Sequence, residues 1–594
     1  MADQRPRRRL AIGLALALAF AGAQATGAAA ASGPDYYGVN IQPMVKLQVV
    51  PPSTWDAFTG AFAGDGMRIA RADIPWSWVE PSAPVGGVHT YDWSRIDPIV
   101  DLLNRHGVQF SAVISTAPSW AGAGVRGGAN VVPEHYPDLA AFSGAVAARY
   151  GGSIDDYEIW TEANSTNFWT HSPNVTEYAN ALKLIYPAIH ANDGGARVLA
   201  SIGWQGFGSY TAQLLTAAGG SFDAIGFHPY APHAPAIIGL VTSMRNVLNV
   251  NGGGSKPIFV TELGQPAVAS GGASSAGSGW VSDAARAATQ SLAGDALAHS
   301  DCNVQDYLLY ANVASETNQE GSGEGFMGIY HKADATPNVT GAAIRDAEAR
   351  WRAAPSIDLN LCNPAPTPQA SMLPLVLALT RDGATCVNGT VTYYGNPVEG
   401  AQLSVVTPGG TPVNAPTDAF GHARACAPSA ASFVAAAGVF KIATSPTVNC
   451  DETAPATPCA ASTTVVPQVP IEGLTQNGTA LQPGTNLVTT PGATTPGSCL
   501  HHLRISLLSL TTRTTRASVR LWCGDALLQR MSVRIDVRRR GAKHRSFLRK
   551  VYIIAGNARP FTLQLHLHKG DRLIAARAAT PGLGVPQLAA GVTR

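Results

Sequence analysis

Eight short apolar runs, separated by amphipathic stretches, follow one another between residue 36 and about residue 355. Each run has the length of a β-strand, and the stretches between them, such as residues 92–107, carry apolar residues on a helical period. Alternating strands and helices are typical of an α/β fold with a parallel sheet. Eight such units predict a (β/α)₈ TIM barrel over residues 32–355. The runs begin near Asp35, Gly66, Val108, Asp155, Arg197, Phe222, Pro257 and Val304.

An open, doubly wound sheet is the alternative, because it is built from the same units. Such sheets often bind a nucleotide through a G-x-G-x-x-G turn after the first strand, and the sequence after residue 40 has no such turn. The pattern therefore favours the closed barrel.

The composition and the hydrophobic pattern of the chain change after about residue 355. A Pro-rich linker is expected at residues 356–372, and a linker rich in Thr, Pro and Gly at residues 463–498. Between them, residues 373–462 alternate short strands with N-G, G-N-P and G-G turns. Residues 499–594 again alternate polar and apolar positions. We therefore expect two small all-β, sandwich-like domains after the barrel.

Residues 1–31 have the pattern of a signal peptide. Arginines at positions 5 and 7–9 precede the apolar run Leu10–Ala25, and small residues up to Ala31 offer cleavage sites. The run is about 16 residues long, which is short for a membrane span, and no later run reaches the roughly 20 residues that spanning requires. The sequence thus predicts an exported protein, secreted or associated with the cell envelope, without a transmembrane span.

All eight cysteines lie after residue 300, and none has the spacing of a zinc site, so we expect structural disulfides and no metal or cofactor. Eight cysteines allow 105 pairings. The simplest is sequential, because three of its pairs then each fall within one module. The expected pairs are Cys302–Cys362, Cys386–Cys426, Cys450–Cys459 and Cys499–Cys523.

Charge is distributed unevenly, although 41 Lys and Arg against 39 Asp and Glu give a net charge of only +2. Residues 501–594 hold 18 basic and 3 acidic residues. For this basic module we favour a solvated surface, with a cell-envelope polyanion as the candidate partner and no nucleic acid. The barrel segment holds 16 basic and 28 acidic residues, which argues against an acidic polysaccharide as its substrate.

Two glutamates directly follow apolar runs. Glu162 lies in "YEIWTEANSTNFW" and Glu262 in "PIFVTELGQP", after the fourth and seventh expected strands. Reactive groups of a TIM barrel project from these carboxyl ends. One carboxylic acid and one carboxylate facing each other are what glycoside hydrolysis needs, one as proton donor and the other as nucleophile. Two hydrogen-bonded structural carboxylates are the alternative.

The segments around these glutamates resemble clan A retaining glycoside hydrolases, and most closely families 39 and 5. "EIWTEANSTNFW" is similar to their E-I-W-N-E-P-N…F-W segment, "PIFVTELG" to the nucleophile strand and "GFHPY" to the sixth strand. The resemblance covers residues 36 to about 350. It implies a retaining O-glycoside hydrolase that cleaves a β-linked glycoside or polysaccharide, with Glu162 as acid/base, Glu262 as nucleophile and carbohydrate as the partner.

The same resemblance implies further site residues. His228 and Tyr230 would line the site beside the nucleophile, and Asn164 would support the acid/base loop. Arg71 would help to keep the nucleophile ionised. For Arg71, a salt bridge with Asp73 or another acid is the alternative, and for His228 a satisfied core histidine.

Aromatic residues gather in the barrel segment. Nine of the 11 tryptophans lie between Trp55 and Trp280, many of them at or just after the expected strands. Flat aromatic rings suit the apolar faces of sugar rings. We expect Trp120 and Trp169 to line the cleft.

Two residues depart from the family pattern. Thr161 stands where the family has Asn, and Ala163 where it has Pro. A threonine cannot offer the amide that contacts the sugar 2-hydroxyl, a contact that strengthens in the transition state. A catalytically weakened glycan-binding barrel of the cell envelope is therefore the alternative function. A third hypothesis is that the β modules anchor the chain to the envelope, with the barrel as passenger.

Overall fold

A computed structural model describes most of the barrel and of the first β module. After residue 450 it describes only the backbones of the strands. The expected signal peptide and the residues Cys459, Cys499 and Cys523 lie outside the described residues. The described ranges are 35–122, 133–169, 173–268, 281–316, 323–362 and 372–450, the last with gaps at 384, 408–411, 427–432, 440–441 and 447.

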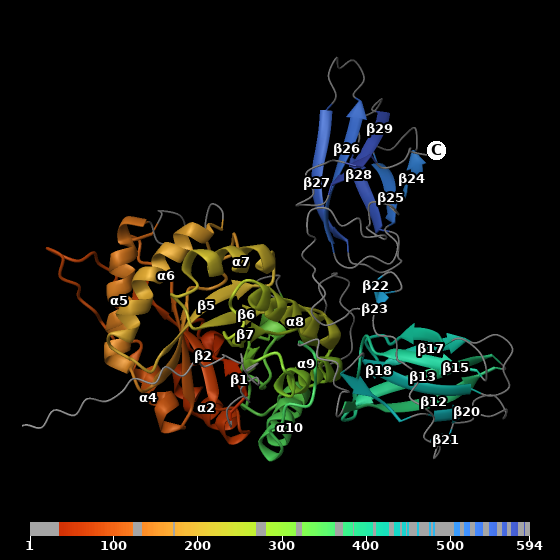
Figure 1. Cartoon of the computed structure of the whole chain (residues 1–594), viewed down its shortest axis with the longest axis horizontal. Helices are drawn as coiled ribbons and strands as arrows, with labels where there is room; N and C mark the ends of the chain where they lie inside the picture. The colour runs from red at the N-terminus through yellow and green to blue at the C-terminus, as the bar shows by residue number, and fades with distance from the viewer. Residues whose placement is uncertain are drawn as a thin grey trace, which may run out of the picture.

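Eight parallel strands close into a barrel in the order β1-β10-β7-β6-β5-β4-β3-β2 (Figure 1). Each strand overlaps one of the eight apolar runs, so the expected TIM barrel is confirmed and the open sheet is excluded. The strands are β1 (Tyr37–Asn40), β2 (Ile69–Pro75), β3 (Gln109–Ser115), β4 (Ile154–Ile159), β5 (Arg197–Gly203), β6 (Ala224–His228), β7 (Ile258–Leu263) and β10 (Val304–Tyr310).

A helix follows each barrel strand and covers its outer side (Figure 1). In α4 the apolar residues Ile99, Val100, Leu102 and Leu103 are buried, as the helical period predicts. The eight helices are α2 (Trp55–Gly64), α4 (Asp97–Arg105), α5 (Tyr136–Tyr150), α6 (Val175–His190), α7 (Phe207–Ala218), α8 (Ala234–Val250), α9 (Asp283–Ala298) and α10 (Val339–Ala353). Short elements in the loops are α1 (Gln42–Val45), η1 (Pro52–Thr54), α3 (Trp76–Val79), η2 (Pro133–His135), β8 (Ala267–Val268), β9 (Val281–Ser282) and η3 (Glu324–Phe326).

The first β module consists of two sheets. One contains β11, β15, β16 and β18–β21, and the other contains β12, β13, β14 and β17. Apolar residues of both sheets are buried, which agrees with a sandwich. The strands are β11 (Leu373–Pro374), β12 (Val376–Asp382), β13 (Cys386–Tyr393), β14 (Asn396–Pro397), β15 (Gln402–Val406), β16 (Val413–Pro416), β17 (His422–Cys426), β18 (Phe433–Val439), β19 (Ala443–Thr444), β20 (Val448–Cys450) and β21 (Ala460–Ala461).

The C-terminal region is also built of strands, and the strand-like runs expected there are confirmed. Strands β24, β25 and β28 form one antiparallel sheet, and β27, β26, β29 and β30 form another. The strands are β22 (Thr475–Gln476), β23 (Thr479–Ala480), β24 (Arg504–Leu510), β25 (Arg516–Trp522), β26 (Gln529–Arg538), β27 (Ser546–Ile554), β28 (Phe561–His566), β29 (Arg572–Ala579) and β30 (Gln587–Leu588).

Two of the expected disulfides, Cys302–Cys362 and Cys386–Cys426, are confirmed. The first joins the end of the barrel to its exit, and the second links the paired residues of β13 and β17. Asp301 lies near the first disulfide, but its carboxylate accepts the backbone N–H groups of Leu361 and Cys362. Among the described residues no other group of ligands suits a metal, and both of these cysteines are oxidised. None of the described helices could cross a membrane.

A buried polar cluster joins the first β module to the barrel. Asp295 of α9 is 2% exposed and accepts hydrogen bonds from Tyr37 of β1 at 2.8 Å and from Tyr393 of β13 at 2.6 Å. Arg350 of α10 donates to the same carboxylate at 2.6 Å, and its guanidinium lies 4.0 Å from the ring centroid of Tyr394. The module is therefore docked on helices α9 and α10.

Candidate active site

Glu162 and Glu262 both lie at the carboxyl ends of barrel strands. Glu262 is the fifth residue of β7, and Glu162 lies three residues after β4 ends. Each side chain keeps 17% exposure, whereas the nearby Glu158 has none. The first two carboxyl groups are therefore accessible from the barrel mouth, and the third is sealed beneath them.

Arg71 connects the carboxylates from inside the barrel. Its guanidinium donates to Glu158 through Nε at 2.6 Å and to Glu262 through Nη1 at 2.7 Å. Burial lowers the pKa of Arg71, but the charges of Glu158 and Glu262 outweigh it and raise the pKa above its ordinary value. Arg71 therefore contacts the expected nucleophile, Glu262, as the resemblance implies. It also forms the internal salt bridge that was the alternative, and its partner in that salt bridge is Glu158. Asp73 pairs with Lys46 instead.

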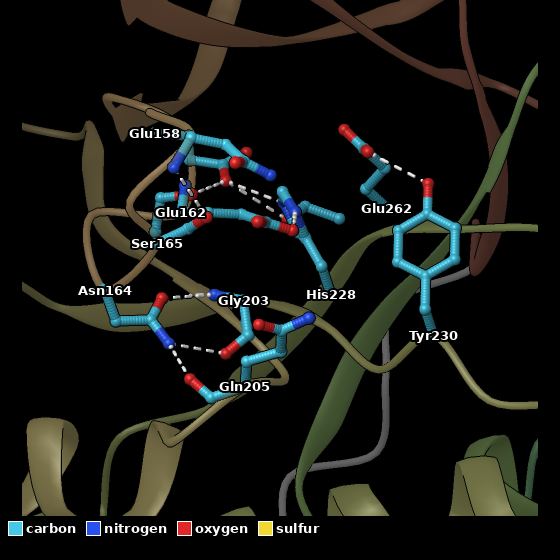
Figure 2. Close-up of polar contacts among 12 residues, drawn as sticks. Glu158, Glu162, Asn164, Ser165, Gly203, Gln205, His228, Tyr230 and Glu262 are labelled. Carbon is cyan, nitrogen blue, oxygen red and sulfur yellow. Dashed lines mark hydrogen bonds and ion pairs between the residues drawn. The ribbon is translucent and has the colours of Figure 1, made fainter. Parts of the chain in front are cut away.

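Tyr230 orients the second oxygen of Glu262. Its hydroxyl donates to Oε1 of Glu262 at 2.9 Å, as the dashed line in Figure 2 shows. Burial, followed by the charge of Glu262, raises the pKa of Tyr230 well above its usual value, so the phenol remains a donor. Both oxygens of Glu262 thus accept a hydrogen bond from a fixed partner, which holds the carboxylate in one orientation.

The loop that carries Glu162 turns sharply. Trp160 and Glu162 have φ angles of 67° and 42°, in the left-handed region that non-glycine residues rarely occupy. Ser201 of β5 holds this turn, because its Oγ accepts the backbone N–H of Glu162 at 3.0 Å and its carbonyl accepts that of Ala163 at 3.1 Å. The turn directs the Glu162 side chain towards His228 (Figure 2).

Asn164 fastens the same loop to the next strand. Its amide nitrogen donates to the carbonyls of Gly203 and Gln205 at 2.8 and 2.7 Å, and its amide oxygen accepts the N–H of Gly203 at 2.7 Å (Figure 2). Asn164 is 9% exposed, so these bonds are shielded from water. These contacts hold the loop that carries Glu162, which is the role that the resemblance implies for Asn164.

His228, at the end of β6, is buried between three carboxyl groups and one guanidinium. Its Nδ1 lies 3.1 Å from Oε1 of Glu162, and its Nε2 lies 3.3 Å from Oε1 of Glu158. Burial lowers the pKa of His228, but the charge of Glu262 and the hydrogen bonds to Glu158 and Glu162 outweigh it and raise the pKa to about 9. A protonated imidazole ring donates from both nitrogens, whereas a neutral ring donates from only one.

Glu158 is the residue that sequence reasoning missed. It lies within β4 between two apolar residues, and a charged group in that position must be paired. This position was the available signal, because an acid between apolar residues of a barrel strand points either into the barrel or into the helix layer. Ser201 was also missed, since a serine within an apolar strand has no distinctive sequence signal.

The two expected cleft tryptophans differ in exposure. Trp120 follows β3, is partly exposed and donates to the carbonyl of Glu80 at 3.1 Å. Trp169 is 1% exposed, because its loop turns back and its indole donates to Glu177 of α6 at 3.0 Å. The ring of Trp169 is therefore covered by protein and does not line a cleft, contrary to the expectation from sequence.

Together these residues define a TIM barrel with two accessible carboxyl groups held over a buried charged network. No protein-family model matches the chain, and no curated protein matches it in sequence. The search of solved structures finds similar glycoside hydrolases. A family 39 glycoside hydrolase from Bacteroides cellulosilyticus WH2 is 14% identical, with a TM-score of 0.42, over 67% of this chain and 81% of that one.

Two further family 39 structures are similar. The β-xylosidase from Caulobacter crescentus is 17% identical, with a TM-score of 0.43, over 64% of this chain and 83% of that one. The enzyme from Xanthomonas axonopodis pv. citri is 14% identical, with a TM-score of 0.42, over 67% of this chain and 92% of that one.

Proposed function

We propose that this chain is a retaining O-glycoside hydrolase that cleaves a β-linked glycoside or polysaccharide by double displacement. The observation that carries the proposal is the unlike setting of the two accessible carboxyl groups. Glu262 is held by Arg71 and Tyr230, whereas Glu162 contacts His228 on a separate loop. When two carboxyl groups of one site have different environments, one can act as the proton donor while the other acts as the nucleophile.

In the first step, an oxygen of Glu262 attacks the anomeric carbon while Glu162 gives its proton to the leaving oxygen. The glycosidic bond breaks and a glycosyl ester forms on Glu262. In the second step, Glu162 takes a proton from water, the resulting hydroxide attacks the anomeric carbon, and the ester bond to Glu262 breaks. Two displacements return the sugar with its original configuration.

Substitution of each glutamate tests the assignment. On a panel of aryl β-glycosides, Glu262→Gln should abolish turnover, whereas Glu134→Gln, an exposed glutamate outside the site, should retain it. NMR of the first-formed sugar should show the β-anomer. Release of the α-anomer, or turnover by Glu262→Gln, would overturn the proposal. Binding of glycans without any turnover would favour the alternative of a glycan-binding barrel.

Glu162→Ala separates the acid from the nucleophile. This variant should still form the glycosyl ester from substrates with very good leaving groups, such as 2,4-dinitrophenyl glycosides, because these need no proton. Added azide should then restore turnover and yield a β-glycosyl azide, since it needs no general base. Azide without effect would count against Glu162 as acid/base.

We also infer that the protein is exported. The arginine-rich and apolar pattern of residues 1–31 and the two disulfides support an oxidising destination. N-terminal sequencing of the mature protein should find it shortened by about 31 residues. Full-length protein inside the cell with reduced cysteines would contradict this inference.

A further inference from the structure

Glu158 lies beneath the two accessible carboxyl groups and is fully buried. Its Oε2 accepts from Arg71 at 2.6 Å, and its Oε1 accepts from Ser201 at 2.5 Å and from Thr261 at 3.3 Å. The Nε2 of His228 also lies 3.3 Å from Oε1. The charges of Arg71 and His228 outweigh burial, which raises the pKa of Glu158, and hold it well below its usual value. The group is therefore a carboxylate.

The barrel is closely packed around this carboxylate. A Cβ at Gly226 of β6 would lie 3.0 Å from Oε1 of Glu158 and 3.2 Å from the hydroxyl of Thr261. A buried charge is costly unless it is well paired, and replacement of such pairs by apolar residues is often stabilising. The stability of the barrel alone therefore does not explain why the chain places a carboxylate here.

We propose that Glu158 is a positioning residue for proton transfer by Glu162, and that it acts through His228. The inference deepens the proposed hydrolase function and rests on it. Glu158 holds the imidazole ring as a cation with Nε2–H directed at itself, so that Nδ1–H is directed at Oε1 of Glu162. The three side chains form a chain from the buried carboxylate to the acid/base.

This arrangement stabilises charge at the moment when it develops. When Glu162 gives its proton to the leaving oxygen, negative charge remains on its carboxyl group, and Nδ1–H of His228 is already directed at that group. Neutral His228 could provide only one ring donor. The charged and titratable groups around the ring are Glu158 of β4, Glu162, Arg71 of β2, Glu262 of β7, and Tyr230.

Glu158 also balances the charge of two adjacent groups, Arg71 and His228. Nη2 of Arg71 lies 3.4 Å from Nε2 of His228, a distance at which a guanidinium and an imidazolium repel each other. Glu158 contacts both, through different oxygens. If the negative charge of Glu158 is removed, His228 should give up its Nε2 proton and accept a hydrogen bond from Arg71 at that nitrogen. Nδ1 could then still carry the remaining proton, but the ring would no longer be a cation.

Kinetics of Glu158→Gln test the proposal. The alkaline limb of the kcat/KM profile should move to lower pH by about one unit or more, because the ring of His228 loses its proton more readily without the negative charge of Glu158. With poor leaving groups kcat/KM should fall about 100-fold, and with 2,4-dinitrophenyl glycosides only about threefold, since these need no acid. An unmoved alkaline limb, or equal losses on both substrates, would overturn the proposal.

Asp156→Asn is the matched control. Asp156 is also a buried carboxylate of β4 and also binds an arginine, Arg197, at 2.6 Å. Both of its side-chain hydrogen bonds go to Arg197, the first residue of β5, whereas His228 is the last residue of β6. Its substitution should lower stability without moving the alkaline limb. A shift as large as that of Glu158→Gln would show that any buried charge on this strand has the effect, and would overturn the specific role.

NMR of the protein labelled with ¹⁵N-histidine gives a readout that needs no turnover. The signals of His228, assigned by their loss in His228→Asn, should show both nitrogens protonated at pH 7 in the full chain. In Glu158→Gln the pKa of His228 should fall by about one unit or more. A neutral His228 in the unmodified protein would overturn the proposal even if the variant fails to fold. Protonated His228 without hydrolysis of any glycoside would instead contradict the proposed function.

Discussion

The side chain of Glu162 fills the space beside Gly203, where a Cβ would lie only 2.7 Å from Cδ of Glu162. The glycine is therefore part of the acid/base site, although it carries no chemistry. Gly203→Ala should displace the carboxyl group and lower kcat/KM on poor leaving groups about 100-fold, because small displacements of reacting groups are costly. Steady-state kinetics with aryl glycosides of graded leaving-group acidity measure this loss.

Gly220→Ala is the control for that substitution, since nothing lies within 4 Å of its Cβ position. It should leave kcat/KM unchanged. Full activity of Gly203→Ala on poor leaving groups would show that Glu162 does not need this position.

Tyr230→Phe removes the hydroxyl that donates to Glu262 at 2.9 Å. We expect kcat to fall about 10- to 100-fold, because the nucleophile loses one of two fixed donors. The thermal midpoint should change little, since the ring still fills its site. Pre-steady-state measurement of aryl alcohol release should locate the loss in formation or breakdown of the glycosyl ester. An unchanged rate for both steps would contradict a role for the hydroxyl.

The raised pKa of His228, about 9, links stability to pH. Because the folded protein binds this proton more tightly than the unfolded chain, whose histidine pKa is about 6.5, the stabilisation is full below about pH 6.5. It is lost as the pH rises through about 9, and its size is on the order of 3 kcal/mol. Urea denaturation of wild type and His228→Asn at about pH 6 and about pH 9.5 checks this. Parallel pH dependence in the two proteins would disprove the link.

The contact between Tyr393 and Asp295 predicts that the first β module stabilises the barrel. Tyr393→Phe should lower the free energy of unfolding by about 1–2 kcal/mol, because it removes a hydrogen bond to a buried carboxylate. Tyr394→Phe is the control, since Tyr394 is 55% exposed. A barrel truncated after residue 362, which keeps the Cys302–Cys362 disulfide, should be less stable than the chain that includes the module. Equal thermal midpoints would show that the module is only tethered.

The sequence predicted the barrel well because every strand lies in a short, mostly apolar run and the runs are separated by helical stretches. It also predicted the two accessible glutamates, because a carboxyl group at a strand end has few structural uses. Pairing inside the barrel was harder. Asp73 and Glu158 are both acids on apolar strands, and only the register of the closed barrel decides that Arg71 binds Glu158.

Side-chain exposure was the other limit of sequence reasoning. Trp120 and Trp169 both follow barrel strands, yet one is partly exposed and the other is 1% exposed. The difference arises from a turn in which the N–H of Trp169 donates to the carbonyl of Ser165, and from the reach of Glu177 on the next helix. Such contacts depend on how a loop folds back, and the hydrophobic periodicity of the sequence does not predict them.

Trapping of the glycosyl ester tests the central claim most directly. A panel of 2-deoxy-2-fluoro-β-glycosides with 2,4-dinitrophenyl or fluoride leaving groups should inactivate the enzyme, because the fluorine slows breakdown of the ester more than its formation. Peptide mapping by mass spectrometry should then find one sugar on the peptide that contains Glu262. A label on another residue, or turnover of aryl glycosides with release of the α-anomer, would contradict double displacement through Glu262.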